Sequence, residues 1–206
     1  YALGADLDAS ATSLWNGGAG FEPIGSSALS PFAGVFDGLG HTINGLTINR
    51  PSTNYVGLFG DTAVDSRIAN IGLINANIVG NSYLGALAGY TNGSILNSYS
   101  TGQVRAYAAN SEYIGGLVGY NDFGSISNSY SSSSVNAGDY NRYIGGFIGV
   151  NNRGVTISDC YSAGSITTGI NNKYVGGFMG LGGAVLNSYS NSTVNAGYNN
   201  MAVGGF

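Results

Sequence analysis

The sequence predicts an all-β protein, a right-handed parallel β-helix (β-solenoid) built from coils of roughly thirty residues. One phrase of the type Tyr-Ile-Gly-Gly-Leu-Val-Gly recurs, with copies that begin at residues 55, 83, 113, 143, 174 and 202. Short β-type runs bounded by turn residues fill each repeat, and none shows a helical period. Right-handed winding is expected because crossovers between parallel strands have that hand.

The composition allows a folded core and argues against some partners. Only 8% of the 206 residues are charged, while 43% are hydrophobic and the chain holds 36 Gly, 15 Tyr and 8 Phe. Disordered chains lack such bulky apolar residues. The net charge of −4 without a basic cluster argues against nucleic acid as a partner. The apolar runs are shorter than the about 20 residues of a membrane span, so no membrane insertion is expected.

The repeats divide the chain into two parts of one continuous solenoid. Residues 1–54 contain strand-like runs and Gly turns without the phrase. We expect irregular N-terminal coils there, since the terminal repeats of solenoids are atypical. Residues 55–206 form the repeat coils, and the last repeat is incomplete. The chain begins without a leader and stops inside a repeat, so it is expected to be a piece of a longer protein.

A second phrase follows the first in each full repeat, as in Ile126-Ser127-Asn128-Ser129-Tyr130-Ser131. Side chains alternate between the two faces of a strand. Ile126, Asn128 and Tyr130 are therefore predicted to share the inward face, and the three serines the outer face. Stacked coils would then form Asn hydrogen-bond ladders and Tyr stacks inside the core.

The paired glycines of the first phrase, such as Gly115-Gly116, need a reason because Gly weakens a strand. Their fixed recurrence predicts either a bend in the strand or a close approach between the backbones of two coils. The sequence leaves both explanations open.

His41 and Cys160 are the single histidine and the single cysteine of the chain. A Ser/His/Asp or Cys/His centre needs a histidine base, so His41 would have to serve alone. A turn or ladder role is the favoured interpretation. Cys160 takes the place of Ser in the sister repeats, and we interpret it as drift at a small-residue position. A site with several Cys or His ligands is excluded by count, and no cofactor is expected.

The N-terminal third is the most acidic region and includes five aspartates: Asp6, Asp8, Asp37, Asp61 and Asp65. Carboxylates from two or three turns can hold Ca²⁺, and clustered Asp also serves polysaccharide-processing β-helix enzymes. Neither the EF-hand spacing nor the calcium-binding nonapeptide occurs. Turn and cap roles are the favoured interpretation, so no metal site is assigned and the five residues stay Ca²⁺ candidates.

Some tyrosines fall in or beside the predicted loops: Tyr107, Tyr120, Tyr140 and Tyr198. Aromatic rings with exposed faces provide large amphipathic contact surfaces, so these residues are the candidate ligand-binding residues. Simple packing is the open alternative. The tyrosines of the two main phrases are interpreted as core ladders instead.

Two parts of the chain resemble a known family. The run 113–121, followed by 124–131, resembles the GLUG repeat, and 36–48 is similar to the segment that commonly precedes such repeats. The resemblance identifies residues 55–206 as GLUG-like repeats of a bacterial surface protein, often a filamentous-haemagglutinin-like adhesin. The family motif carries no catalytic residues, so the resemblance implies none here.

Together these observations predict a non-catalytic scaffold of a bacterial surface adhesin or matrix protein, located outside the cell or on its surface. Its loops would bind glycan or a host or matrix protein. One alternative is a structural spacer or filament subunit that associates end to end through its open strand edges. A polysaccharide-processing β-helix enzyme is a second alternative.

Overall fold

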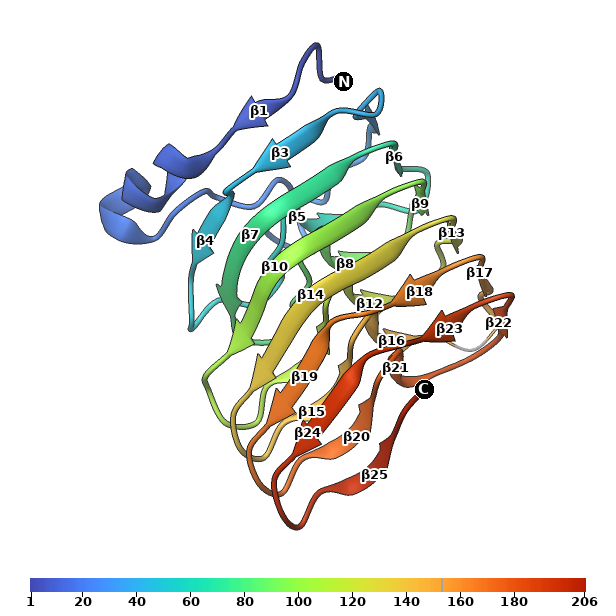
Figure 1. Ribbon diagram of the computed structural model, residues 1–206. Coiled ribbons are helices and arrows are strands. Elements are labelled where there is room, and N and C mark those ends of the chain that lie inside the picture. The colour runs from blue at the N-terminus through green and yellow to red at the C-terminus, as the bar shows by residue number, and fades with distance from the viewer. Residues whose placement is uncertain (153) are drawn as a thin grey trace.

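The computed structural model describes residues 1–152 and 154–206, and its strands wind into successive coils (Figure 1). A ten-stranded sheet runs along one side of the coils. It contains β1 (Leu7–Asp8), β3 (Thr42–Asn44), β4 (Thr47–Asn49), β7 (Gly72–Gly80), β10 (Tyr99–Ala106), β14 (Tyr130–Ala137), β18 (Tyr161–Ser162), β19 (Ser165–Thr168), β23 (Tyr189–Ser190) and β24 (Thr193–Ala196).

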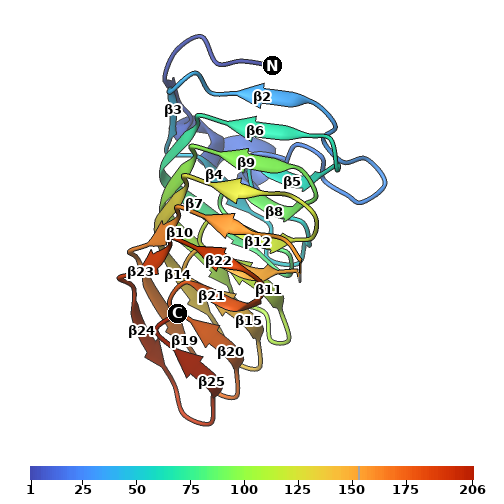
Figure 2. The ribbon, with the colours of Figure 1, turned by 90° about the vertical axis from the view of Figure 1, so that its right-hand side faces the viewer.

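Three further sheets complete the coils (Figure 2). The four-stranded sheet contains β11 (Glu112–Gly115), β15 (Arg142–Gly145), β20 (Lys173–Gly176) and β25 (Met201–Gly204). The five-stranded sheet contains β5 (Phe59–Thr62), β8 (Ala88–Thr91), β12 (Val118–Asn121), β16 (Ile148–Asn151) and β21 (Met179–Gly182). The six-stranded sheet contains β2 (Val35–Asp37), β6 (Arg67–Ala69), β9 (Ser94–Leu96), β13 (Ile126–Ser127), β17 (Ile157–Ser158) and β22 (Val185–Leu186).

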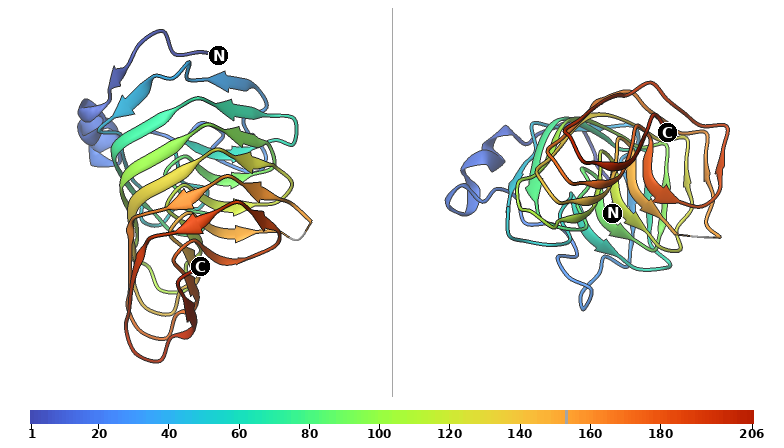
Figure 3. Two further views of the ribbon diagram at one scale, coloured as in Figure 1. Left: turned by 45° about the vertical axis from the view of Figure 1, so that its right-hand side comes forward. Right: turned by 90° about the horizontal axis from the view of Figure 1, so that it is seen from below.

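The predicted parallel β-helix is confirmed. Strands of neighbouring coils pair in parallel, with like residues opposite one another: Ile114 pairs with Ile144, and Ile144 pairs with Val175. The strands nearest the viewer run from upper right to lower left while the coils advance towards the lower right, so the winding is right-handed (Figure 1). Seen from below, the coils lie over one another and enclose the core (Figure 3).

The N-terminal residues form the first, less regular coils. Strands β1 and β3 join the ten-stranded sheet, and β2 joins the six-stranded sheet. A 3-10 element, η1 (Ser10–Gly18), lies beside them at the N-terminal end of the stack (Figure 1). Within residues 1–152 and 154–206 no helix is long and apolar enough to cross a membrane.

Apolar side chains of equivalent positions stack inside the coils and form one core. Ile95, Ile126 and Ile157 are fully buried and belong to strands that pair in register. The rings of Phe147 and Phe178 stack with their centroids 4.9 Å apart. Because the strand spacing is about 4.8 Å, identical side chains on adjacent coils fall at van der Waals contact.

The prediction for the second phrase holds for Ile126 and Ser127 and is wrong from Asn128 onward. Asn128 adopts a left-handed backbone, with a φ of 50°, and this turn shifts the alternation by one residue. Ser129 and Ser131 are consequently buried, whereas Asn128 is exposed and Tyr130 is half-buried on the outer surface. Asn tolerates this backbone region better than most residues, which explains its recurrence here.

Asparagine ladders do form, on both sides of the wall. On the outside, the Asn97 Nδ2 atom donates to Asn70 Oδ1 at 2.9 Å, and the Asn70 Nδ2 atom donates to Asp37 Oδ1 at 2.9 Å. A second, buried ladder lies before the first phrase. There the backbone N–H of Asn141 donates to Asn172 Oδ1 at 2.7 Å, and that of Ser111 donates to Asn141 Oδ1 at 2.8 Å.

The second glycine of each pair marks a close approach between coils. A Cβ added to Gly116, Gly146 or Gly177 would collide with the backbone carbonyl oxygen of the equivalent glycine in the next coil. The equivalent Gly205 of the last coil has open space around it. The recurrence of the second glycine therefore follows from the stacking of backbone against backbone. The first glycine faces its own coil, because a Cβ added to Gly115 would collide with the backbone carbonyl oxygen of Val118, as a bend in the strand requires.

We predict that Gly146→Ala destabilises the fold by about 1–3 kcal/mol, because one coil must shift to admit the methyl group. Gly205→Ala is the matched control, since its methyl group meets no neighbour. Urea unfolding followed by circular dichroism measures both variants. Equal losses of stability in the two variants would contradict the close-approach explanation.

Candidate functional site

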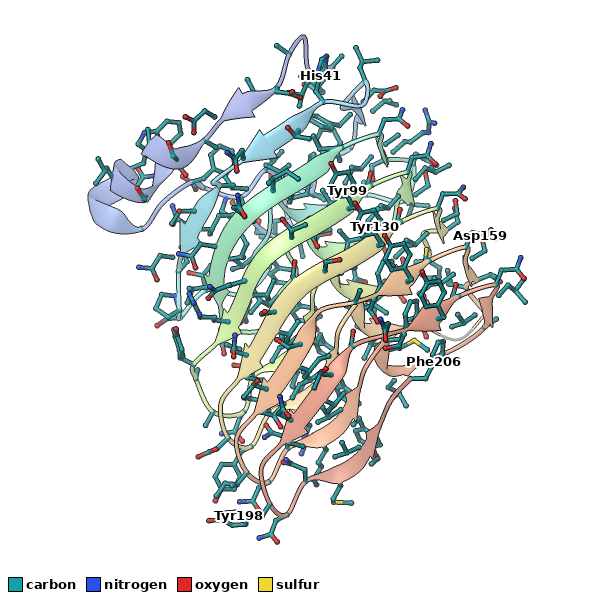
Figure 4. The ribbon with its side chains drawn as sticks, viewed as in Figure 1. His41, Tyr99, Tyr130, Asp159, Tyr198 and Phe206 are labelled. Atoms are coloured by element: carbon teal, nitrogen blue, oxygen red, sulfur yellow. The ribbon has the colours of Figure 1, made fainter. Side chains whose placement is uncertain are left out.

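Tyrosines gather in ladders on the outer surface. The long ladder consists of Tyr55, Tyr83, Tyr113, Tyr143 and Tyr174, whose successive ring centroids lie 4.7 to 5.3 Å apart. The second ladder consists of Tyr99, Tyr130, Tyr161 and Tyr189, with spacings of 4.6 to 5.2 Å. Figure 4 shows Tyr99 and Tyr130 on neighbouring strands at the front of the molecule. The interpretation of these residues as core ladders is therefore wrong, because the stacks lie outside the wall.

Stacking determines what these ladders can bind. Each ring inside a ladder has both faces covered by its neighbours, so ring edges and hydroxyl groups are what remains for solvent. Edges and hydroxyls donate and accept hydrogen bonds, whereas a sugar stacks on a face. A ligand can therefore stack only where a ladder is interrupted or ends.

Tyr90 and Tyr120 form a short row beside the long ladder. Their rings stack with centroids 5.2 Å apart and an angle of 1° between planes. Each of them also packs edge-to-face against two rings of the long ladder: Tyr90 against Tyr55 and Tyr83, and Tyr120 against Tyr83 and Tyr113. The short row thus fills the spaces between successive rings of the long ladder.

A carboxylate lies at the edge of the short row. The Tyr90 hydroxyl donates to Asp122 Oδ2 at 2.8 Å, and Asn152 Nδ2 donates to Asp122 Oδ1. Burial, together with the Asp122 carboxylate, raises the pKa of Tyr90. Burial also raises the pKa of Tyr113 to about 12. Both phenols are therefore neutral hydrogen-bonding groups near pH 7.

A hollow of about 280 Å³ opens where the short row stops. The position that carries Tyr90 and Tyr120 carries Val150 on β16 and Leu181 on β21. The hollow is lined by Tyr113, Tyr120, Tyr143, Val150, Asn151, Asn152, Leu181 and Gly182. We call it the tyrosine hollow.

The structure separates the tyrosines that the sequence proposed as binding residues. Tyr120 lies on strand β12 and lines the tyrosine hollow. Tyr107, Tyr140 and Tyr198 lie in turns and expose 65%, 52% and 70% of their surface. All of these turns lead from the ten-stranded to the four-stranded sheet. Tyr198 projects at the lower edge of the molecule (Figure 4).

Three of the five aspartates of the N-terminal third accept backbone hydrogen bonds. Asp6 accepts the backbone N–H of Thr42 at 2.8 Å, and Asp8 accepts that of Ser10 at 2.9 Å. Asp37 accepts the backbone N–H of Leu39 and the side chain of Asn70, and these bonds lower its pKa. Asp65 is exposed. Among the described residues, no three His, Cys, Asp or Glu side chains are grouped to hold a metal ion.

Asp61 differs from the other aspartates. Only 4% of its surface is exposed, and its Oδ1 atom is buried without a hydrogen-bond partner among the described residues. The segment around Gly25 and Phe32 pairs with its backbone and covers it. Desolvation by this burial raises the pKa of Asp61 to about 6.

The single histidine and cysteine have ordinary surroundings. His41 Nδ1 lies 3.3 Å from Asp6 Oδ1 at the N-terminal end of the stack. Cys160 is buried, and its Sγ atom donates to Ser158 O at 3.1 Å, as Ser129 Oγ donates to Ser127 O at 2.8 Å. Burial raises the pKa of the Cys160 thiol to about 12. A thiol in this state is a poor nucleophile.

Fold and surface together define a parallel β-helix of stacked repeats with regular rows of outward side chains. Its repeats include the GLUG motif, which matches residues 80–105 and 110–136. The resemblance drawn from residues 113–131 is thereby confirmed.

Named proteins share this sequence pattern over part of the chain. Halomucin of Haloquadratum walsbyi is 42% identical over 123 residues, which are 58% of this chain and 1% of halomucin. A protein of Evansella cellulosilytica described as a Gly-rich membrane protein is 38% identical over 100 residues, which are 47% of this chain and 11% of that protein. The chain therefore spans a small part of the length of these relatives.

A solved structure shares the fold. A protein of Bacteroides ovatus described as an immunoglobulin A1 protease superposes with a TM-score of 0.76 at 23% identity. The match covers 98% of this chain and 67% of the other. At this identity the similarity concerns the fold.

Sequence reasoning missed the tyrosine hollow, although a signal was present. The residue after the last glycine of the first phrase is Tyr90, Tyr120, Val150 and Leu181 in successive repeats. Aligning the repeats shows that an aromatic row ends after Tyr120. The alignment does not show that these positions point outward, between the rings of the long ladder.

We predict that Asp61 makes stability fall as pH rises. Its folded pKa of about 6 lies above the ordinary aspartate value of 3.8, so between these values the folded state binds more protons than the unfolded state. The free energy of unfolding of the wild type, relative to Asp61→Asn, is therefore highest near pH 4 and falls until the pH passes 6. The variant should be the more stable protein at pH 7.

Thermal melts of wild type and Asp61→Asn between pH 4 and pH 8 measure this difference. A difference that stays constant across the range would show that the Asp61 carboxyl has no raised pKa in the folded state.

Proposed function

We propose that this chain is a non-catalytic scaffold segment of a surface-associated, extracellular protein, and that it displays aromatic side chains to glycans. The observation that carries the proposal is the placement of Tyr107, Tyr140 and Tyr198 in equivalent turns along one edge. A stack of hydrogen-bonded coils holds these turns at fixed spacings. Exposed tyrosines on such a frame provide large contact area at low entropic cost.

The relatives support a surface location. One is named halomucin, and another is described as a membrane protein. The proposed adhesin or matrix role goes beyond these names and depends on the exposed tyrosines of the turns. A host or matrix protein is the alternative partner, and it would use the same turns.

The chemistry of the described residues supports a non-catalytic role over the polysaccharide-processing alternative. Carboxylates that cleave glycosidic bonds work as a pair facing one substrate. Here Asp8 and Asp37 accept hydrogen bonds from their own turns, and Asp61 is buried. Asp6 accepts the backbone N–H of Thr42 on the paired strand β3. His41 is paired with Asp6, and Cys160 is buried with a raised thiol pKa.

We predict selective, saturable binding of the purified chain to a glycan array. Tyr140→Ala and Tyr198→Ala should each weaken this binding by about three- to tenfold, the value of one aromatic contact. Tyr1→Ala is the matched control, because Tyr1 is 85% exposed but lies at the N-terminal end. Runs with and without Ca²⁺ test the metal role of the aspartates. A blank array from a folded protein would contradict glycan display.

A spacer or filament role is the second candidate, and the face of the last coil favours it. Leu186, Met201, Val203 and Phe206 each expose 45% to 57% of their surface there. The edges of β21 to β25 also present unpaired backbone groups on this face, and such edges pair readily with further strands. A further coil, of the same protein or of a second copy, would bury this surface.

We predict that the purified chain associates through this face as its concentration rises. Val203→Lys should abolish association, because Val203 stacks in register on the buried Val175 and a lysine there places a charge against an incoming coil. Sedimentation velocity measures the effect, with Val64→Lys as the control on another exposed valine. A strict monomer at high concentration would contradict the filament role.

A further inference from the structure

The packing of the short tyrosine row against the long ladder is regular and is interrupted at one position. Each of its rings occupies the space between two successive rings of the long ladder. The next space lies between Tyr113 and Tyr143. In-register pairing assigns this space to Val150, which is too small to fill it.

The tyrosine hollow is therefore a missing ring position. Both Tyr113 and Tyr143 line it, as the regular packing requires, and Tyr120 forms one wall. Tyr120 stacks on Tyr90 with one face, so its second face is the one turned to the hollow. Val150 and Leu181 supply an apolar base from adjacent coils.

Polar groups surround this apolar base. The buried Asn151 is engaged within the wall, where its Oδ1 accepts from Asn121 at 2.8 Å and its Nδ2 donates to Val155 O at 2.9 Å. Asn152 lies at the rim and connects to Asp122, which also holds the Tyr90 hydroxyl. The Tyr113 phenol, protonated at neutral pH, lies on the other side.

We propose that the tyrosine hollow binds one neutral pyranose ring, stacked on the free face of Tyr120 with its hydroxyls towards Asn152, Tyr113 and Tyr143. This proposal rests on the proposed glycan-display function and adds a binding site to the exposed tyrosines of the turns. The match is chemical: a pyranose has an apolar C–H face and a polar rim, and so does the hollow. An aromatic side chain of a partner protein would use the face of Tyr120 but not the polar rim.

The test is a substitution that places a tyrosine ring in the hollow. Val150→Tyr extends the short row by one ring and closes the hollow, and the regular packing predicts a folded protein with an unchanged or higher melting temperature. Tyr120→Leu is the second variant, because it removes the stacking face and keeps the hollow open. Tyr161→Leu is the control, since it removes a ladder tyrosine on another sheet.

The probes are the methyl glycosides of glucose, galactose and mannose, together with p-cresol as an aromatic probe. Binding is followed by amide shifts in NMR spectra of the whole chain. We expect saturable shifts at Tyr120, Val150 and Asn152 with at least one glycoside. Val150→Tyr should abolish them, Tyr120→Leu should weaken binding about tenfold, and Tyr161→Leu should leave it unchanged.

Several outcomes would overturn the proposal: no shifts with any glycoside, shifts with p-cresol alone, or glycoside binding that survives in Val150→Tyr. The glycan array separates this failure from failure of the proposed function. Array binding that depends on Tyr140 and Tyr198 but persists in Val150→Tyr would leave glycan display in place and remove the hollow as its site. If neither the wild type nor any variant bound the array, both the glycan-display function and the sugar site in the hollow would be contradicted.

Discussion

The backbone hydrogen bonds between coils fix a repeat distance of about 4.8 Å along the axis, and the rest of the structure follows from that distance. Side chains of equivalent positions are held at a distance that allows offset stacking of aromatic rings and hydrogen bonding between amides. Tyrosines therefore stack, asparagines bond to asparagines, and phenylalanines such as Phe147 and Phe178 lie flat on one another. Where two backbones meet directly, as at Gly116 and Gly146, no side chain can be present at all.

The same distance makes the fold predictable and its surface harder to predict. Repeated phrases at thirty-residue intervals are sufficient to infer stacked parallel coils, because in-register stacking places the like residues of successive repeats in contact. The orientation of each side chain depends instead on single backbone angles. One left-handed residue, Asn128, reverses inside and outside from its own position to Ser131, and the alternation rule contains no such information.

The tyrosines of the long ladder show a related conflict between backbone preference and stacking. Tyr55, Tyr83, Tyr113, Tyr143 and Tyr174 all have a positive φ, between 52° and 63°. This conformation is unfavourable for a bulky residue, and the ring contacts along the ladder offset the strain. The candidate site shares this origin, because the hollow beside Val150 exists only where the repeats stop being identical. The aligned phrases show where the aromatic row is interrupted, whereas the depth and the lining of the hollow can be seen only in the folded structure.

The orientation of the coils also has a mechanical consequence. Hydrogen bonds between coils run along the axis, so tension applied along it pulls on the bonds of one coil at a time rather than on all of them together. A coil that contributes about 4.8 Å of length while folded would release about 100 Å of extended chain when peeled off. Because each coil contacts chiefly its neighbours, such a segment would lengthen in discrete steps under load and rewind when the load is removed.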